Sequence, residues 1–557
     1  MKEIIILLLL LNFSTSLCHG QDRTVGTIIL EPESMDGYTF FSPFSGSNAY
    51  MVDNCGNLIN QWDRESLPGL AAYFRNDGNV LRTYKVNPVG PFTSASNAGG
   101  IEIVDWDNNT LWSYEINSAT ELSHHDAVML SNGNILVLSW ELIQRDELIR
   151  LGRDPGEIAP QGFVWGERII ELRPVGSNEA EIVWEWRIKD HFVQDIDTSL
   201  SNFGLISENA SLFDINLPDI NSNNSHSDFD YNHFNAIDYH EELDQILLSV
   251  RNSDEIWILD HSTTTAEAAS HDGGNSGMGG DILYRWGNPS AYQGASISKQ
   301  RFFGQHGANW IPEGPDKDKI LIYNNGNGRP GTDYSTIEIL EPPYRIDGTY
   351  EKIDSEPFGP NAVNWKYGDD VEDRFYSPFL SNAQYLKNGN ILINAGSRGE
   401  IFEITYDREV VWKYIIPLFG DFPATQGDNI NNNATFRAYK YSTDFLGFED
   451  LDIEAGAPIE LEPILFAGCE SSNSTLSYID EPVFRVYASK ESFYVEKLLP
   501  GIIELSYYDI QGSLIQSIKL DNHMTTLPTS NISSGTYIFI AKNLNQRTFI
   551  QKCTLIK

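Results

Sequence analysis

Three histidines occupy one equivalent position in segments that lie far apart along the chain. His125 opens the segment HDAVMLSNG and His306 opens HGANWIPEG, and the two align without a gap, while His233 opens HFNAIDYHEE. In two further segments the equivalent residues are Ser381 and Leu70. A lone histidine at the start of a strand is usually structural, but three at one repeat position predict a shared site. Imidazoles in such a site can exchange protons near neutral pH or attack an electrophile.

A second equivalent position lies farther along the same segments, and its residues are Lys85, Trp140, Arg251, Asn325 and Gly396. Arg251 could form a surface salt bridge, but at the rim of a shared site its guanidinium would bind a tetrahedral oxyanion through two N–H groups. An anion needs such local positive charge, because 78 acidic against 38 basic residues give the chain a formal charge of −40. The same charge argues against nucleic acid and anionic membranes as partners.

Metal binding is an alternative use of three imidazoles, which are a common ligand set for catalytic zinc. Against this alternative, the adjacent Arg251 would repel a cation, and no carboxylate stands at the repeat position. Asp126 follows His125 directly, but neighbours on a strand point to opposite faces. We therefore predict no metal and no cofactor for this site.

The rest of the chain predicts an all-β fold. Short runs rich in Ile, Val, Leu, Tyr and Trp alternate with Asn, Asp and Gly turns, and convincing amphipathic helices are missing. Asn/Asp-Gly-Asn turns precede β-runs at 77–79, 132–134 and 388–390. A strand ends in tryptophan six times, at Trp62, Trp112, Trp184, Trp286, Trp365 and Trp412. Repeats of this size predict a six-bladed β-propeller over residues 21–475, with the first strands completing the last blade.

In a propeller the innermost strand of each blade lines a central channel. Equivalent positions of different blades therefore converge on the axis, and we expect the three histidines and Arg251 to meet there. The tryptophans should fill the gaps between blades and take no part in the chemistry.

The two ends of the chain predict export and an extra domain. Residues 1–20 are typical of a signal peptide, and no later apolar run reaches the 18 residues of a membrane span, so we expect a secreted protein. Residues 476–557 are typical of a small C-terminal β-sandwich. Cys55 and Cys469 either form a disulfide between the start and the end of the main domain or remain buried thiols.

The histidine segments resemble the arylsulfate sulfotransferase family. The resemblance rests on HHDAVMLSNGNIL, HFNAIDYHEELDQILLSVRNSDEIW, YRWG and FFGQHGANWIPEG, and it covers most of residues 25–460. It implies a six-bladed propeller in which His306 is transiently sulfated, with an aryl sulfate as donor and a phenol as acceptor. It also implies that His233 and Arg251 bind the sulfuryl oxygens and that His125 acts beside them. No phosphate-binding loop for a nucleotide donor is found. We expect further substrate contacts from His124, Ser381, Asn235 and Asn325.

The C-terminal segment resembles the sorting domains of the type IX secretion system, through the elements YDIQG and SGTYIF. This resemblance implies the secretion machinery as a partner, export through the periplasm of a Gram-negative bacterium, and a secreted or cell-surface location. An accessory β-sandwich is the alternative interpretation of the tail.

A non-catalytic secreted propeller that binds sulfated or anionic ligands is the alternative interpretation of the whole protein. The loops at 272–275 and 324–328 would fit ligand or calcium binding, although such Asn, Asp and Gly loops are usually solvated turns.

Overall fold

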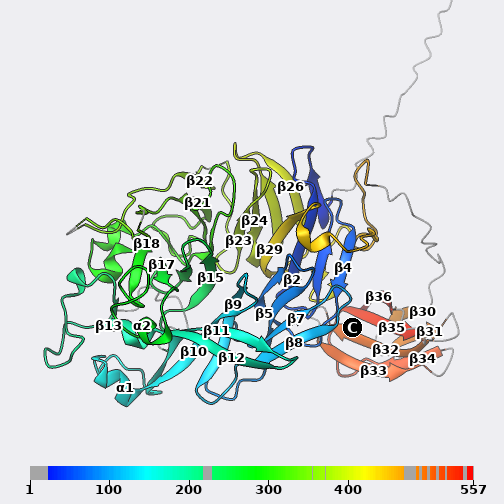
Figure 1. Cartoon of the computed structure of the whole chain (residues 1–557). Helices are drawn as coiled ribbons and strands as arrows, with labels where there is room; N and C mark the ends of the chain where they lie inside the picture. Colours follow the sequence, from blue (N-terminus) through cyan, green and yellow to red (C-terminus); the bar gives the residue numbers. More distant parts are fainter. Residues whose placement is uncertain are drawn as a thin grey trace, which may run out of the picture.

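The computed structural model shows a chain built almost entirely of β-strands (Figure 1). Its described α-helices are short, namely α1 (Arg145–Arg150) and α2 (Thr265–Ala268). None of the helices within the described residues has the length and apolar character needed to cross a membrane. The predicted signal peptide at 1–20 lies outside the described part of the chain. The structure describes residues 23–217, 229–345, 347–353, 356–370, 372–469, 484–488, 492–497, 502–509, 513–520, 524–543 and 548–555.

Six sheets of four or five antiparallel strands occupy residues 26–442 of the described chain, and we number them in chain order. Sheet 1 contains β5 (Pro68–Phe74), β6 (Val80–Lys85), β7 (Gly99–Val104) and β8 (Thr110–Glu115). Sheet 2 contains β9 (Glu121–Met129), β10 (Ile135–Gln144), β11 (Phe163–Val175) and β12 (Glu179–Arg187). Sheet 3 contains β15 (Phe234–His240), β16 (Gln245–Val250), β17 (Glu255–Asp260) and β18 (Ile282–Trp286).

The remaining three of these sheets include strands from the N-terminal end of the chain: sheet 5 gains β1, and sheet 6 joins β29 to three N-terminal strands. Sheet 4 contains β19 (His306–Trp310), β20 (Ile320–Asn324), β21 (Thr336–Leu340) and β22 (Trp365–Tyr367). Sheet 5 contains β23 (Asn382–Tyr385), β24 (Ile391–Ala395), β25 (Glu400–Ile404), β26 (Val410–Ile415) and β1 (Gly26–Leu30). Sheet 6 contains β29 (Thr435–Ser442), β2 (Gly37–Pro43), β3 (Ala49–Val52) and β4 (Leu58–Trp62).

The first strands of the six sheets form a closed circuit. Strand β5 contacts β9, β9 contacts β15, β15 contacts β19, β19 contacts β23, β23 contacts β29, and β29 contacts β5 again. As expected from the sequence, strands near the N-terminus complete the last sheet, because β2 pairs with β29 along most of its length. The circuit therefore brings the equivalent positions of different sheets to one centre.

The six tryptophans predicted to mark the ends of strands lie one in each sheet, in β4, β8, β12, β18, β22 and β26. Each indole N–H donates a hydrogen bond to the sheet that follows in the circuit. For example, Trp62 Nε1 lies 2.8 Å from the Asp105 carbonyl oxygen, and Trp412 Nε1 lies 2.8 Å from that of Asn54. Indoles that are apolar on their faces and polar at one edge suit this position between two sheets.

The first strands depart from regular strand geometry at the positions that the sequence singles out. His125, His233 and Ser381 adopt left-handed backbone conformations with φ of 46°, 57° and 88°, and Gly307, which directly follows His306, has φ of 60°. Residues with a Cβ rarely adopt this region, and such outliers cluster at functional sites. The pairing register also shifts near His125, His233 and His306. The alternation of neighbouring side chains between two faces is therefore interrupted there.

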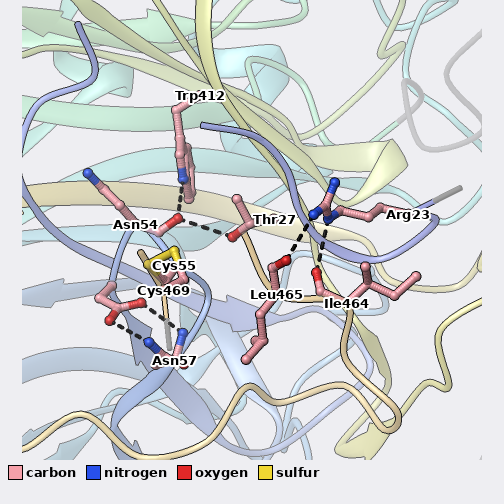
Figure 2. Close-up of a disulfide and its surroundings, with 10 residues drawn as sticks. Arg23, Thr27, Asn54, Cys55, Asn57, Trp412, Ile464, Leu465 and Cys469 are labelled. Atoms are coloured by element: carbon pink, nitrogen blue, oxygen red, sulfur yellow. Dashed lines mark hydrogen bonds between the residues drawn. A yellow bond between two sulfur atoms is a disulfide. The ribbon is translucent and has the colours of Figure 1, made fainter. Parts of the chain in front are cut away.

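Cys55 and Cys469 form a disulfide across 414 residues, with their Cα atoms 5.6 Å apart (Figure 2). Cys55 lies in the turn between β3 and β4, so the bond attaches the segment after sheet 6 to that sheet. Arg23 adds a second link between the two ends, because its Nε donates to the carbonyl oxygen of Ile464 at 2.9 Å. Of the two alternatives for these cysteines, the structure contains the disulfide.

The C-terminal segment forms two sheets around a core of its own. One sheet contains β30 (Phe484–Ala488), β31 (Ser492–Lys497) and β34 (Met524–Pro528). The other contains β32 (Ile502–Asp509), β33 (Leu514–Lys519), β35 (Gly535–Asn543) and β36 (Thr548–Leu555). Both sheets contribute to one apolar cluster, with Phe493 and Val495 from the first and Leu505 and Phe539 from the second. This core is separate from the clusters of the six large sheets.

Candidate active site

The three histidines of the repeat position lie together at the centre of the circuit. The rings of His125 and His233 meet edge to face, with centroids 4.6 Å apart. His306 is close enough to both that the charges of the three imidazoles influence one another. His125 and His306 are buried, with exposed fractions of 2% and 4%. The convergence expected from the sequence is therefore present in the structure.

His306 opens β19, and its hydrogen bonds determine which ring nitrogen carries the proton. Its Nδ1 lies 3.0 Å from the carbonyl oxygen of Gly304 and 2.7 Å from Oδ1 of Asn325. The Asn325 amide is oriented by its own donor, because Nδ2 donates to the carbonyl oxygens of Ser377 at 2.8 Å and Leu380 at 3.1 Å. Both partners of Nδ1 can only accept, so Nδ1 carries the proton and Nε2 has the lone pair.

The surroundings of His306 also keep its ring neutral. Burial lowers its pKa first, and the neighbouring Arg251 guanidinium lowers it further, to about 3. The hydrogen bond that Nδ1 donates to Asn325 acts in the opposite direction but does not outweigh these two effects. At neutral pH the Nε2 lone pair is therefore available to attack an electrophile.

Arg251 follows β16 and is held beside two of the histidines. Its backbone N–H donates to the His233 carbonyl oxygen at 3.2 Å. Its pKa is lowered by burial, although the charges of Asp254 and Asp230 act against this shift. Asp254 in turn accepts the backbone N–H of Gly304 at 2.6 Å, which joins the Arg251 turn to the segment that carries His306. Strand β16 thus places a guanidinium next to the nucleophile candidate.

His233 has a carboxylate partner instead of a neutral one. Its Nδ1 hydrogen-bonds Oδ2 of Asp230, which is fully buried. The turn that holds Asp230 is fastened by Asn252, whose Nδ2 donates to the Asp230 carbonyl oxygen at 2.6 Å. A carboxylate at Nδ1 fixes the orientation of the ring. Nε2 of His233 is therefore the ring nitrogen that could exchange a proton with a substrate.

His124, predicted to contact substrate, lies behind His125. The left-handed backbone at His125 lets the two adjacent rings meet, and their Nδ1 atoms are 2.8 Å apart. His124 stacks on Trp140 with ring centroids 4.1 Å apart, and its Nε2 lies 3.0 Å from a carboxylate oxygen of Glu167. The other Glu167 oxygen accepts the backbone N–H of Phe234 at 2.8 Å. Glu167 and His124 thus orient His125, whose pKa is held well below its usual range by burial and by His233.

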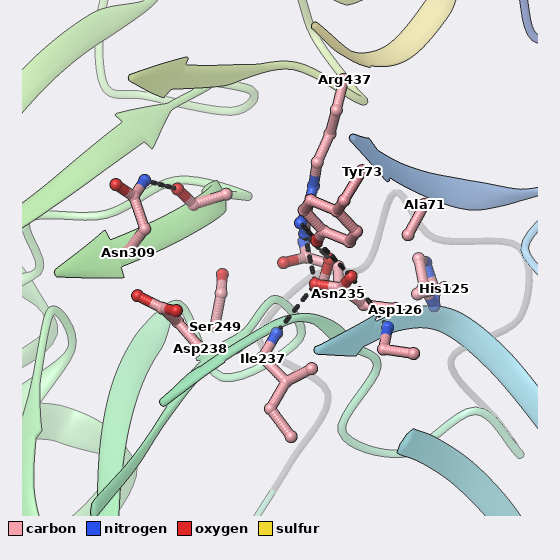
Figure 3. Close-up of polar contacts among 12 residues, drawn as sticks. Ala71, Tyr73, His125, Asp126, Asn235, Ile237, Asp238, Ser249, Asn309 and Arg437 are labelled. Carbon is pink, nitrogen blue, oxygen red and sulfur yellow. Dashed lines mark hydrogen bonds and ion pairs between the residues drawn. The ribbon is translucent and has the colours of Figure 1, made fainter. Parts of the chain in front are cut away.

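A charged network that the sequence did not predict lies beside His125 (Figure 3). Arg437 on β29 donates to Oδ2 of Asp126 at 2.6 Å and to the Asn235 carbonyl oxygen at 3.1 Å. Tyr73 donates to the second Asp126 oxygen at 2.5 Å and accepts from Arg437. The side chains of Arg437 and Asp126 are 5% and 0% exposed, so they form a buried ion pair. Strands of sheets 1, 2, 3 and 6 are joined by this one network.

The other three residues predicted to bind substrate hydrogen-bond protein groups. Asn325 holds the His306 ring. Ser381 accepts the backbone N–H of Gly396 at 2.9 Å and lies 2.9 Å from the Ser377 hydroxyl. Asn235 donates to the carbonyl oxygen of Gln305, next to His306, at 2.7 Å, while its Oδ1 has no hydrogen-bond partner within the described residues. Of the three, Asn235 keeps a polar atom that a substrate could use.

An apolar cluster lies next to the polar side chains. Leu70 occupies the histidine-equivalent position of sheet 1 and packs with Leu380 and Phe436. The Phe436 ring centroid lies 6.1 Å from that of His125. The centre of the circuit therefore combines imidazoles and guanidinium groups with a wall against which an aromatic ring could pack.

Comparisons with solved structures give only distant similarities. A protein of unknown function from Bacteroides caccae has 12% identity over 68% of this chain and 94% of its own, with a TM-score of 0.36. A streptogramin B lyase has 10% identity over 71% of this chain and 83% of its own, with a TM-score of 0.32. The virginiamycin B lyase of Staphylococcus aureus has 11% identity over 72% of this chain and 87% of its own, with a TM-score of 0.31. None is close enough to bear on the chemistry.

The family comparison is more specific. No curated protein matches the chain significantly. The family model described as arylsulfotransferase (ASST) matches residues 33–409, which include all three histidines and Arg251. With a match over more than half of its length and the predicted residues gathered at one centre, the chain belongs to the arylsulfotransferase family.

Proposed function

We propose that this protein transfers a sulfuryl group from an aryl sulfate to a phenol through a covalent intermediate on Nε2 of His306. The observation that carries the proposal is the proton arrangement of that ring. Nδ1 donates to two acceptors, the carbonyl of Gly304 and the side-chain oxygen of Asn325, so Nε2 keeps its lone pair. A neutral imidazole can attack without first losing a proton.

In the first half-reaction, Nε2 of His306 attacks the sulfur of the donor. A nitrogen–sulfur bond forms and the bond from sulfur to the phenolic oxygen breaks. The three remaining sulfuryl oxygens carry the negative charge, and the Arg251 guanidinium is positioned to bind them with charge-assisted hydrogen bonds. The departing phenolate takes a proton from the His233 imidazolium, which Asp230 supports from behind.

In the second half-reaction, the acceptor phenol gives its proton to His233 and attacks the same sulfur. The nitrogen–sulfur bond breaks and His306 returns to its neutral form. The different Nδ1 partners suit these roles. Neutral acceptors leave the positive charge of sulfated His306 only weakly stabilised, so this ring remains a good leaving group. The carboxylate at His233 favours a ring that holds a proton.

The apolar wall supports an aromatic substrate. Leu70, Leu380 and Phe436 would pack against the phenyl ring of the donor or the acceptor while the charged end reaches the histidines. The mechanism moves the sulfuryl group from one phenol to another by way of His306, so it requires no nucleotide donor and no cofactor.

We also propose the wider context of this activity. The six sheets are the blades of a propeller whose first strands line the channel, and the two C-terminal sheets are a β-sandwich that serves as a sorting domain for the secretion machinery. The protein is secreted or displayed on the surface of a Gram-negative bacterium after export through the periplasm. A disulfide between Cys55 and Cys469 is in keeping with an oxidising compartment.

The direct test is to incubate the full-length protein with a phenyl sulfate and no acceptor. We expect a burst of phenol equal to a single equivalent of enzyme, and a sulfuryl mass on the peptide that contains His306. His306→Ala should lose both, whereas His240→Ala, which removes a histidine paired with Asp318 outside the site, should keep both. Binding of the aryl sulfate without any release of phenol would instead identify a non-catalytic binding protein.

A further inference from the structure

A second histidine cluster lies away from the proposed active site. His191 ends the short 3-10 helix η1 (Ile188–His191), while His271 and Asp281 lie in the segment between α2 and β18. Nδ1 of each histidine is 2.8 Å from the same oxygen, Oδ1 of Asp281. All three of these ligand-type atoms lie within 4.8 Å of one another. The function described above uses none of these residues.

Both ring nitrogens of the buried member of this cluster face oxygen atoms. Nε2 of His191 lies 2.8 Å from the carbonyl oxygen of Ala268, which can only accept, so Nε2 carries the proton. In a neutral His191, Nδ1 therefore has the lone pair, and it faces Oδ1 of Asp281. An electron pair and a carboxylate oxygen at this distance repel each other unless a proton or a metal ion is bound there.

The ring of His191 is held in this orientation by close packing. Trp186 stacks on it with ring centroids 5.3 Å apart and planes 3° from parallel, and donates its indole N–H to the Gly280 carbonyl oxygen at 2.7 Å. A Cβ at Gly280 would lie 2.8 Å from Cε1 and Nε2 of His191, so only glycine permits this approach. In contrast, the side chain of His271 is 61% exposed. The cluster is thus rigid on its inner side and open to solvent on the other.

We propose that His191, His271 and Asp281 bind a divalent transition metal ion, and Zn²⁺ is the ion that we would test. Two imidazoles and one carboxylate are a known three-ligand set for zinc, and the open side leaves room for water as the fourth ligand. Both histidines would coordinate through Nδ1, with the Ala268 carbonyl fixing the His191 tautomer as metal-bound histidines require. The ion replaces any proton on the two Nδ1 atoms.

The expected effect of the ion is structural. It would fasten the glycine-rich segment at 269–281 to η1, next to β18 of sheet 3, the sheet whose β15 and β16 adjoin His233 and Arg251. The sequence predicted no metal and no cofactor, because Arg251 beside the three active-site histidines would repel a cation; the proposed ion departs from that prediction. His191, His271 and Asp281 have no recognisable motif spacing, so only the folded chain brings them together.

The test is a zinc titration of the metal-depleted full-length protein in competition with a chromogenic chelator, with metal content measured separately. We expect one tightly bound Zn²⁺ per chain. His271→Ala removes an exposed ligand and should weaken binding at least about 100-fold, because even partners of ligands change affinity by about 10–100-fold. Asp281→Asn should weaken binding in the same direction.

Two further variants separate this site from other histidines. His306→Ala should retain the ion, and so should His240→Ala, whose ring pairs with Asp318 instead. The proposal is wrong if the wild-type protein binds no zinc, or if His271→Ala binds it as tightly as the wild type. Loss of zinc in His306→Ala with retention in His271→Ala would assign the ion to the active site and would also overturn the proposal. Thermal unfolding of each variant confirms that it is folded.

Discussion

Replacing Asp230 with asparagine tests whether His233 transfers the proton to the leaving phenolate. Asp230 is fully buried, and its Oδ2 is the partner of Nδ1 of His233. The substitution keeps the size of the side chain, and Asn252 can still bind the backbone carbonyl of residue 230. The variant therefore keeps the turn and removes the negative charge that faces the His233 ring, a charge that also acts on Arg251.

The size of the effect should depend on the donor. A general acid contributes about 10²–10⁴-fold to a rate, or about 3–5 kcal/mol of barrier, when the leaving group needs a proton. With phenyl sulfate, whose phenolate is strongly basic, we expect Asp230→Asn to lower kcat/KM by about 10²–10⁴-fold. With a nitrophenyl sulfate, whose phenolate is stable without a proton, the loss should stay below about tenfold. Initial rates with both donors and one saturating acceptor give the ratio.

Asp238→Asn is the matched control. Asp238 is another carboxylate of sheet 3 and is half-buried, but its oxygens accept the backbone N–H groups of Trp310 and Tyr239. Its loss should leave the ratio between the two donors unchanged. Equal losses with both donors in Asp230→Asn would show that Asp230 only supports the structure, and the assignment of His233 as the proton donor would be refuted.

The remaining predictions concern charge, covalent closure and pH. Arg251→Met should lower kcat/KM by about 10²–10⁴-fold, because two charge-assisted hydrogen bonds of about 1.5–3 kcal/mol each are lost. Arg301→Met, at an exposed arginine, should keep kcat/KM within about twofold of the wild type. Equal activity of the two variants would exclude Arg251 from sulfuryl binding. Cys55→Ser should lower the free energy of unfolding in urea by about 2–5 kcal/mol, and added reductant should no longer change the stability of this variant. An unchanged midpoint of urea denaturation would contradict a stabilising disulfide. Burial alone would lower the pKa of His261, but hydrogen bonds to Asp244 and Glu171 raise it to about 9, so its stabilising contribution is complete below about pH 6.5 and is lost as the pH rises to 9. His261→Gln should therefore flatten the fall in unfolding free energy between pH 6.5 and 9, and parallel curves for variant and wild type would refute this account.

Much of the fold could be predicted because its units repeat. The Asn-Gly-Asn turns and the terminal tryptophans recur with little change, and each tryptophan does lie between two sheets. The strand β29 is followed by neither an Asn-Gly-Asn turn nor a terminal tryptophan, because the strands that continue its sheet, beginning with β2, come from the other end of the chain. For this reason the sixth repeat could be inferred only from its tryptophan, and Arg437 on β29 could not be identified.

The candidate site was predicted where repeats supply the residues and missed where they do not. His125, His233 and His306 stand at one repeat position and meet. Strand alternation was the reason for separating Asp126 from the His125 ring, but the left-handed backbone at His125 interrupts that alternation. The rule therefore could not foresee that His124 and His125 face each other.

The carboxylates behind the histidines differ in how visible they are in the sequence. Asp230 lies three residues before His233, a local signal that could have been used. Glu167 reaches His124 from another strand of the same sheet, and nothing in its local sequence identifies it. Partners that only pairing between strands brings together remain out of reach of pattern reasoning.

The pairing of β29 with β2 affects how this molecule can be made. A ribosome releases β2, β3 and β4 long before it reaches β29, so these strands wait with an open edge that could pair with other chains. The ion pair between Asp126 and Arg437 cannot form in the meantime. Synthesis that stops before residue 435 would yield five nearly complete sheets and an inactive product. The proposed activity therefore requires β29, the strand that closes the circuit.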